Sequence, residues 1–128
     1  MIRITAALVL LLGTAAILPA QTVSADEFEK LVKDKKVFLL DVREPKELTE
    51  EGAIEGYHLI PISQLESRLN EVPKDKTIVT LCRRGGRANR AAELLRSKGY
   101  KVAASCGITQ WKESGKKVTY PKEDEIKK

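Results

Sequence analysis

A short loop around Cys82 holds the residues of this chain that are best suited to chemistry. Within TLCRRGGRANRAAELL (80–95), one of only two cysteines is followed closely by three arginines and two glycines. An apolar, β-branched strand pattern (77–81) precedes the loop, and a helix pattern with an alanine and leucine stripe (87–99) follows it. Open α/β sheets bind ligands beyond the carboxyl ends of their strands, and Cys82 lies at such a position.

The residues after the cysteine suit the binding of an anion. Backbone N–H groups at a helix N-terminus are unpaired and favour negative charge. Gly85 and Gly86 allow the loop to curl so that successive N–H groups face one point. Arg83, Arg84 and Arg87 add fixed positive charge, and guanidinium groups bind oxyanions through paired hydrogen bonds.

These surroundings would activate the thiol of Cys82. A free cysteine has a pKa near ~8.5, and helix N-termini and cationic neighbours lower that pKa to roughly 3.5–7.5. The loop therefore predicts a nucleophilic thiolate that meets an anionic substrate. The alternative interpretation is a structural cysteine on a glycine turn with solvent-facing arginines.

The rest of the chain alternates predicted strands with predicted helices. Short apolar patterns predict strands at 37–42, 57–61, 77–81 and 101–104, and amphipathic patterns predict helices at 24–34, 62–72, 87–99 and 108–114. Residues 43–56 contain one proline and two glycines and predict a loop with one helical turn at most. The strands are apolar enough to be buried on both faces, which is typical of parallel strands. The sequence therefore predicts an α/β fold with a mainly parallel sheet.

Two of the predicted helices begin with a capping pattern. Ser24 followed by Glu27 predicts the start of the first helix. Ser63 followed by Glu66 predicts the start of the helix at 62–72. In each case the serine would accept a hydrogen bond from an N–H group that the first helical turn leaves unpaired.

Residues 1–20 have the layout of a secretory signal peptide, with one arginine, an apolar run and then small residues. The run is shorter than the ~20 apolar residues of a membrane-spanning helix, although a retained N-terminal anchor is an alternative. Ala20 and Ala25 both suit a cleavage site. A cut after Ala25 would remove the cap at Ser24, so we favour a cut after Ala20. We expect a periplasmic or secreted protein with no stable membrane insertion once the signal is removed.

The composition is that of one small globular domain. The 128 residues are 42% hydrophobic and 32% charged, with a net charge of +5. Aromatic residues make up only 5%, and acidic residues interrupt the basic ones, so we expect no nucleic-acid partner. We expect a monomer with its domain over residues 23–118 and a charged, loosely held tail over residues 119–128.

Four segments, taken in order along the chain, resemble a known family. They are LLDVREP (39–45), GAIEGYHLIP (52–61), CRRGGRANRAAELL (82–95) and GITQW (107–111). In these segments the chain is similar to the rhodanese-homology domains. The resemblance implies an α/β domain with a central, mainly parallel sheet and helices on both faces. Active members of that family are sulfurtransferases, so the resemblance also implies a single-domain, exported thiosulfate sulfurtransferase.

The resemblance assigns roles to the residues of the loop. Cys82 would be the nucleophile that carries sulfur as a persulfide. The substrate-binding residues would be Arg83, Arg84, Gly85, Gly86 and Arg87. The donor would be a small anion such as thiosulfate, the acceptor would be a thiol or cyanide, and the reaction would use no metal or other cofactor. The six-residue loop from Cys82 to Arg87 matches the sulfurtransferases, whereas the related dual-specificity phosphatases have a loop one residue longer.

The remaining family positions are partly kept and partly changed. Asp41 and Arg43 match the family's DxR pattern, and we interpret them as a structural pair under the loop rather than as substrate contacts. Ala53 and Glu55 replace the histidine and proline that the family often has in GHIPGA. His58 is the only histidine, and nothing supplies the orienting partner that base catalysis needs, so we treat it as a bystander.

The second cysteine, Cys106, replaces a glycine that the family usually has. It could form a disulfide with Cys82, act as a resolving thiol that turns the persulfide over, or be a buried and inert residue. A disulfide requires Cα atoms within about 7 Å, which the sequence alone does not determine.

The sequence favours a sulfurtransferase that moves a sulfane sulfur through a persulfide on Cys82. One alternative is a non-catalytic rhodanese-like binding module, although purely binding members commonly lack the cysteine. Another is a redox-gated persulfide carrier that uses Cys106. A phosphatase or an arsenate-reductase-like enzyme fits the short loop poorly.

Overall fold

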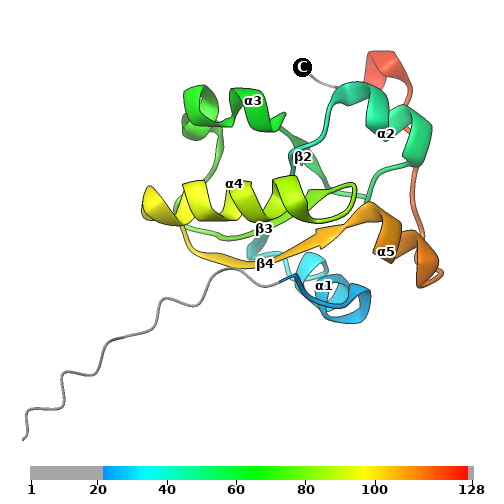
Figure 1. Ribbon diagram of the computed structural model, residues 1–128, viewed down its shortest axis with the longest axis horizontal. Helices are drawn as coiled ribbons and strands as arrows, with labels where there is room; N and C mark the ends of the chain where they lie inside the picture. The colour runs from blue at the N-terminus through cyan, green and yellow to red at the C-terminus, as the bar shows by residue number, and fades with distance from the viewer. Residues whose placement is uncertain (1–21, 127–128) are drawn as a thin grey trace, which may run out of the picture.

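The computed structural model describes residues 22–126, so the predicted signal peptide lies outside the described residues. The described residues fold around a sheet of four parallel strands in the order β2-β1-β3-β4 (Figure 1). The strands are β1 (Val37–Asp41), β2 (His58–Leu59), β3 (Thr77–Cys82) and β4 (Val102–Gly107). The helices are α1 (Ala25–Val32), α2 (Pro45–Glu51), α3 (Ile62–Leu65), α4 (Gly86–Ser97) and α5 (Ile108–Glu113), with 3-10 helices η1 (Glu66–Glu71) and η2 (Glu123–Glu125). Within this part of the chain, no helix combines the length and apolar character that crossing a bilayer requires.

Helices cover both faces of the sheet, which confirms the predicted α/β architecture. In Figure 1, α3 and α4 lie on one face and α1 lies on the other. Leu40 of β1 packs with Leu95 of α4 in one buried cluster, while Leu39 packs with Trp111 of α5 in a second cluster. Successive side chains of a strand point to opposite faces, so neighbouring residues of β1 enter different clusters. This arrangement explains why the strand sequences are apolar almost throughout.

The carboxyl ends of three parallel strands meet at one edge of the sheet. Asp41 ends β1, Cys82 ends β3, and Gly107 ends β4 in register with Cys82. Thr80 of β3 donates a 2.9 Å hydrogen bond from Oγ1 to the carbonyl of Ala88, which ties this strand to α4. The loop between β3 and α4 therefore lies where open α/β sheets bind ligands.

The first helix begins where the sequence predicts. Ser24 Oγ accepts a 3.2 Å hydrogen bond from the N–H of Glu27. Just before this cap, Thr22 forms a parallel bridge with Ser105 of β4, and the N–H of Val23 donates to the Ser105 carbonyl at 3.1 Å. Cleavage at the later of the two candidate positions would remove these contacts.

The prediction of a loop at 43–56 is wrong, because this segment contains the helix α2. The N–H of Glu44 donates to Glu47 Oε2 at 2.8 Å in a capping box. Pro45 occupies the first helical position, where an N–H group would have no partner within the helix. Proline therefore marks a helix start here and not a break.

The predicted helix at 62–72 is also shorter and begins differently. Pro61, and not Ser63, occupies the N-cap position, and its side chain makes no capping bond. After one turn of α-helix the chain continues as the 3-10 helix η1. The predicted strand at 57–61 shortens to β2, while the one at 101–104 extends to β4. Pairing with neighbouring strands decides these lengths, and the pattern of a single segment does not contain that information.

The segment at 119–126, for which the sequence predicts a loosely held tail, is largely exposed but contacts the domain near its two ends. Ala53 and Thr119 exchange backbone hydrogen bonds of 2.7 and 2.8 Å. η2 lies beside α2 (Figure 1), and Ile126 is only 6% exposed in a cluster with Leu48 and Leu59. One apolar residue in a charged run is a weak sequence signal, because its burial depends on a cluster built from distant parts of the chain.

Replacing the buried Ile126 by alanine should destabilise the domain. Truncating a buried isoleucine costs about 2–5 kcal/mol, and at this peripheral cluster we expect a loss near the lower end of that range. Urea unfolding measures the change, and Tyr120→Ala, at a side chain that is 58% exposed, is the control. Equal unfolding free energies for Ile126→Ala and the unchanged protein would mean that the segment does not pack in solution.

Candidate active site

Cys82 lies at the end of β3 with its thiol turned toward the loop. The residue is 1% exposed, and Sγ accepts a 2.9 Å hydrogen bond from the N–H of Gly85. Gly85 has φ of +107°, a conformation that strongly favours glycine, and it caps the helix that begins at Gly86. The loop therefore turns sharply and points a backbone N–H group at the sulfur.

An open depression surrounds this thiol on the surface. Its lining residues are Cys82, Arg83, Arg84, Gly86, Arg87 and Arg90. The structure thus brings the predicted loop residues together and adds Arg90, which the sequence analysis did not single out. The available signal was its spacing, because Arg90 lies three residues after Arg87 and so on the same side of α4.

Two carboxylates of α2 hold two of the loop arginines. Arg87 donates two hydrogen bonds to Glu47, of 2.8 and 2.7 Å, and Arg83 lies 3.0 Å from a carboxylate oxygen of Glu51. Both glutamates belong to the stretch that was predicted to be a loop, so the sequence analysis did not find them. Their spacing of four residues puts them on one face of a helix once α2 is recognised.

The ion pairs distribute positive charge unevenly around the thiol. Hydrogen bonds from Arg87 hold the pKa of Glu47 below its ordinary value, and the same bonds raise the pKa of Arg87. Among the described residues, the exposed guanidinium groups of Arg84 and Arg90 have no carboxylate partner. The uncompensated positive charge therefore lies with Arg84 and Arg90.

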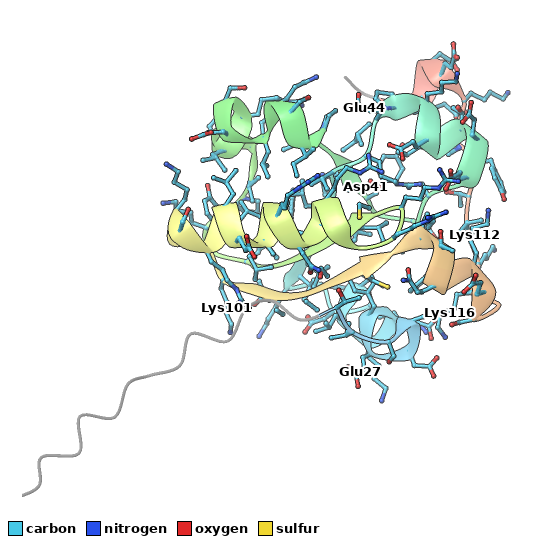
Figure 2. The ribbon with its side chains drawn as sticks, viewed as in Figure 1. Glu27, Asp41, Glu44, Lys101, Lys112 and Lys116 are labelled. Atoms are coloured by element: carbon cyan, nitrogen blue, oxygen red, sulfur yellow. The ribbon has the colours of Figure 1, made fainter. Side chains whose placement is uncertain are left out.

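Asp41 and Arg43 form a fully buried ion pair near this edge of the sheet. Arg43 Nη2 lies 2.7 Å from Asp41 Oδ2, and it also donates to the carbonyl of Gly52 at 2.9 Å. Figure 2 places Asp41 in the interior between α2 and α4 and Glu44 at the start of α2. Neither residue of the pair lines the depression, so the geometry agrees with a supporting position rather than a substrate contact.

The other side of the loop rests on β4 and α5. The N–H of Thr109 donates to the carbonyl of Arg83 at 3.1 Å. A side chain on Gly107 would place its first carbon 2.7 Å from that carbonyl and 2.8 Å from the Cα of Arg84. Only glycine allows this approach, so Gly107 holds the loop close to the strand end.

Cys106 and Cys82 are both free thiols and lie on opposite faces of the sheet. Cys106 pairs in register with Leu81, and both side chains enter the cluster that also holds Trp111. Burial raises the pKa of the Cys106 thiol. Because side chains on opposite faces point apart, the structure does not bring the two thiols together for a disulfide.

The changed family positions lie away from the depression. Ala53 is buried against the C-terminal segment, and Glu55 is exposed. His58 stacks on Phe38 at 4.2 Å between ring centres, and burial lowers its pKa. Within residues 22–126, no cluster of three or more histidine, cysteine or acidic side chains could hold a metal ion.

Replacing Arg43 by methionine should strongly destabilise the fold, because it leaves the buried carboxylate of Asp41 unpaired. Breaking a buried pair costs about 3–5 kcal/mol. Arg68→Met breaks the exposed pair with Glu71 and should cost below about 1 kcal/mol. Denaturant unfolding measures the loss of unfolding free energy in each variant. Similar losses for Arg43→Met and Arg68→Met would contradict the interpretation of Arg43 as a structural residue.

Replacing Glu47 by glutamine should destabilise the protein in a pH-dependent way. The folded-state pKa of Glu47 is lowered, so its stabilisation is present above the ordinary value of 4.5 and is lost as the pH falls below it. The unfolding free energy of Glu47→Gln should be lower by roughly 1–2 kcal/mol at neutral pH, and the difference should vanish at acid pH. Glu50→Gln, whose carboxylate meets only Lys46 at 3.6 Å, is the control on the same helix. If the loss of unfolding free energy in Glu47→Gln is the same at every pH, the ion pair between Glu47 and Arg87 is not its cause.

Comparison with known proteins supports the family resemblance. Residues 24–114 match the family model of the rhodanese-like domain. An Allochromatium vinosum protein named sulfurtransferase is 30% identical over 95 residues, which cover 73% of this chain and 88% of that protein. The Bacillus subtilis protein YqhL, named as uncharacterized, is 42% identical over 79 residues, which cover 62% of this chain and only 60% of YqhL.

Solved structures lead to the same assignment. The crystal structure of a rhodanese-related protein from Thermoplasma volcanium superposes with a TM-score of 0.71 at 31% sequence identity, covering 79% of this chain and 99% of that protein. The matched region contains the parallel sheet and the cysteine loop, and relatives with this domain include named sulfurtransferases. The chain therefore belongs to the family of rhodanese-like domains.

Proposed function

We propose that this protein is a sulfurtransferase in which Cys82 carries sulfur as a persulfide. The observation that carries the proposal is the bond from the Gly85 N–H to Cys82 Sγ at the base of a cationic depression. A backbone N–H stabilises an anionic sulfur, and arginines at the rim attract an anionic donor. The name of the Allochromatium vinosum relative supports the same class of activity.

In the first step, the Cys82 thiolate attacks the sulfane sulfur of a thiosulfate-like donor. A new S–S bond forms on Cys82, the S–S bond of the donor breaks, and sulfite leaves with the bonding electron pair. The step transfers no proton and needs no outside oxidant or reductant. The outer sulfur of the persulfide then carries the negative charge, and the loop N–H groups can donate hydrogen bonds to it.

In the second step, an acceptor thiolate or cyanide attacks the outer sulfur of the persulfide. The S–S bond on the enzyme breaks, its electron pair returns to the Cys82 sulfur, and the product leaves as a persulfide or thiocyanate. The thiolate of the resting enzyme is thereby restored. Because the depression that Cys82 lines is open, an acceptor can reach the persulfide from solvent.

We propose different tasks for the loop arginines, based on the carboxylates that they contact. Arg83 and Arg87 are held by carboxylates of α2 and keep the loop shaped. Arg84 is exposed and has no such partner among the described residues, so we propose that it meets the sulfonate group of the donor. The resemblance implied that all three arginines bind the substrate directly. We now propose direct contact with the donor for Arg84 alone among these three.

We also propose that the protein works after export, as the layout of residues 1–20 suggests. An oxidising compartment favours disulfides between thiols that can meet. Cys106 points to the other face of the sheet and is buried, so it is unsuited to trap Cys82 or to resolve its persulfide. We therefore favour a one-cysteine mechanism over a redox-gated carrier.

Replacing Cys82 by serine should abolish sulfur transfer while the fold persists. Intact mass after incubation with thiosulfate should show one added sulfur atom on the unchanged protein, and cyanide should remove it. Cys106→Ser is the matched control and should still gain the sulfur. Circular dichroism checks that both variants are folded.

Three results would contradict this proposal. Transfer activity that survives in Cys82→Ser would mean that another group carries the sulfur. No adduct on the unchanged, reduced protein would favour a non-catalytic binding module. An adduct that is lost in Cys106→Ser would favour the redox-gated carrier.

A further inference from the structure

A polar network lies behind the cysteine loop, on the side away from α2. Its members are Thr22 before α1, Asn89 in the first turn of α4, and Ser105 of β4. These residues come from three separate parts of the chain, and none of them lines the depression around the thiol. The sulfur-transfer chemistry proposed above assigns them no role.

Asn89 is the centre of the network. The hydroxyl of Ser105, a fully buried residue, donates to Asn89 Oδ1. Asn89 Nδ2 donates to Thr22 Oγ1 at 3.2 Å. Buried hydroxyl groups need a hydrogen-bond partner, so the amide of Asn89 is fixed on one side by Ser105 and on the other by Thr22.

The same network touches the residue that contacts the sulfur. The backbone N–H of Asn89 donates to the carbonyl of Gly85 at 2.9 Å, as the first turn of α4 requires, so Asn89 lies one helical turn beyond this glycine. A carbon added to Gly85 would lie 3.5 Å from Thr22 Oγ1 and 3.7 Å from Thr22 Cγ2, so the Thr22 side chain lies against this glycine. On its other side, Gly85 donates its N–H to Cys82 Sγ at 2.9 Å. Gly85 is therefore held between the network and the thiol.

We propose that Thr22, Asn89 and Ser105 are positioning residues that keep the Gly85 N–H directed at Cys82 Sγ. Gly85 has no side chain of its own and a left-handed φ, so its orientation depends on what packs against it. The Thr22 side chain supplies that packing, and its hydrogen bonds with the Asn89 side chain hold it in place. The effect that we expect on sulfur transfer rests on the proposed sulfurtransferase function.

The network also connects the N-terminal segment with the active site. The parallel bridge between Thr22 and Ser105 places this segment along the edge of β4. A signal cleavage after Ala20 would leave Thr22 in the mature chain, whereas one after Ala25 would remove it. If Thr22 positions Gly85 in this way, the reactivity of Cys82 depends on the position at which the predicted signal peptide is cleaved.

Substitutions at Thr22 test the proposal, because this residue is exposed and its change should not unfold the domain. Thr22→Val keeps the shape and removes the hydroxyl, while Thr22→Ser keeps the hydroxyl. The first measurement is the rate of Cys82 alkylation by iodoacetamide at neutral pH, in the Cys106→Ser background. The second is the separate effect on kcat and KM for transfer from thiosulfate to cyanide.

We expect Thr22→Val to slow alkylation about fivefold, the size of effect that the loss of one hydrogen bond produces. The kcat should fall by a similar factor with KM nearly unchanged, because the arginines that would meet the donor are untouched. Thr22→Ser should behave like the unchanged protein. Ser97→Ala, which removes a hydroxyl at the far end of α4, should also have no effect.

Alkylation of Thr22→Val at the unchanged rate would overturn the proposal. So would equal slowing in Thr22→Ser, because the hydroxyl would then not be the relevant group. Alkylation requires no sulfur donor, so the two proposals can fail separately. A chain that transfers no sulfur but shows slowed alkylation only in Thr22→Val would contradict the proposed function and support the positioning network.

Discussion

The candidate active site depends on one interaction, the hydrogen bond from the N–H of Gly85 to the sulfur of Cys82. It forms only because a parallel strand ends at the cysteine, a left-handed glycine reverses the chain, and a helix begins at the next residue. Three structural elements hold this short turn in place. Carboxylates of α2 pair with Arg83 and Arg87, Gly107 of β4 allows close contact from below, and the network centred on Asn89 packs from behind.

The charges around the sulfur follow from the same arrangement. Arginines adjacent to a thiol favour its anionic form and attract anions. A guanidinium group binds an anion through directed hydrogen bonds, so its position must also be defined. The pairs with Glu47 and Glu51 fix two of them and neutralise their charge in part, while Arg84 and Arg90 keep theirs exposed. Near the same edge of the sheet, Asp41 and Arg43 form a fully buried ion pair. The site thus combines a fixed frame with a cationic rim.

The sequence was most informative where local pattern and chemistry coincide. The strand before Cys82, the glycine turn and the alanine-striped helix are adjacent in the chain, so their geometry could be predicted from the order of residue types. The partners of that loop could not, because Glu47 was hidden in a segment whose proline indicated a loop, and Thr22 and Ser105 meet Asn89 only after the sheet has formed. The separation of Cys106 from Cys82 also required strand register, which decides the face to which each side chain points. Burial of Ile126 depended in the same way on distant residues.

The most direct test of the central claim uses thiosulfate that carries radioactive sulfur at one of its two positions. The proposed mechanism moves only the outer, sulfane sulfur to Cys82. Label at the sulfane position should therefore appear on the peptide that contains Cys82 and be released by cyanide, while label at the sulfonate position should not bind. Label on the Cys106 peptide, transfer from both positions, or no labelled peptide after incubation of the reduced protein would contradict the persulfide on Cys82.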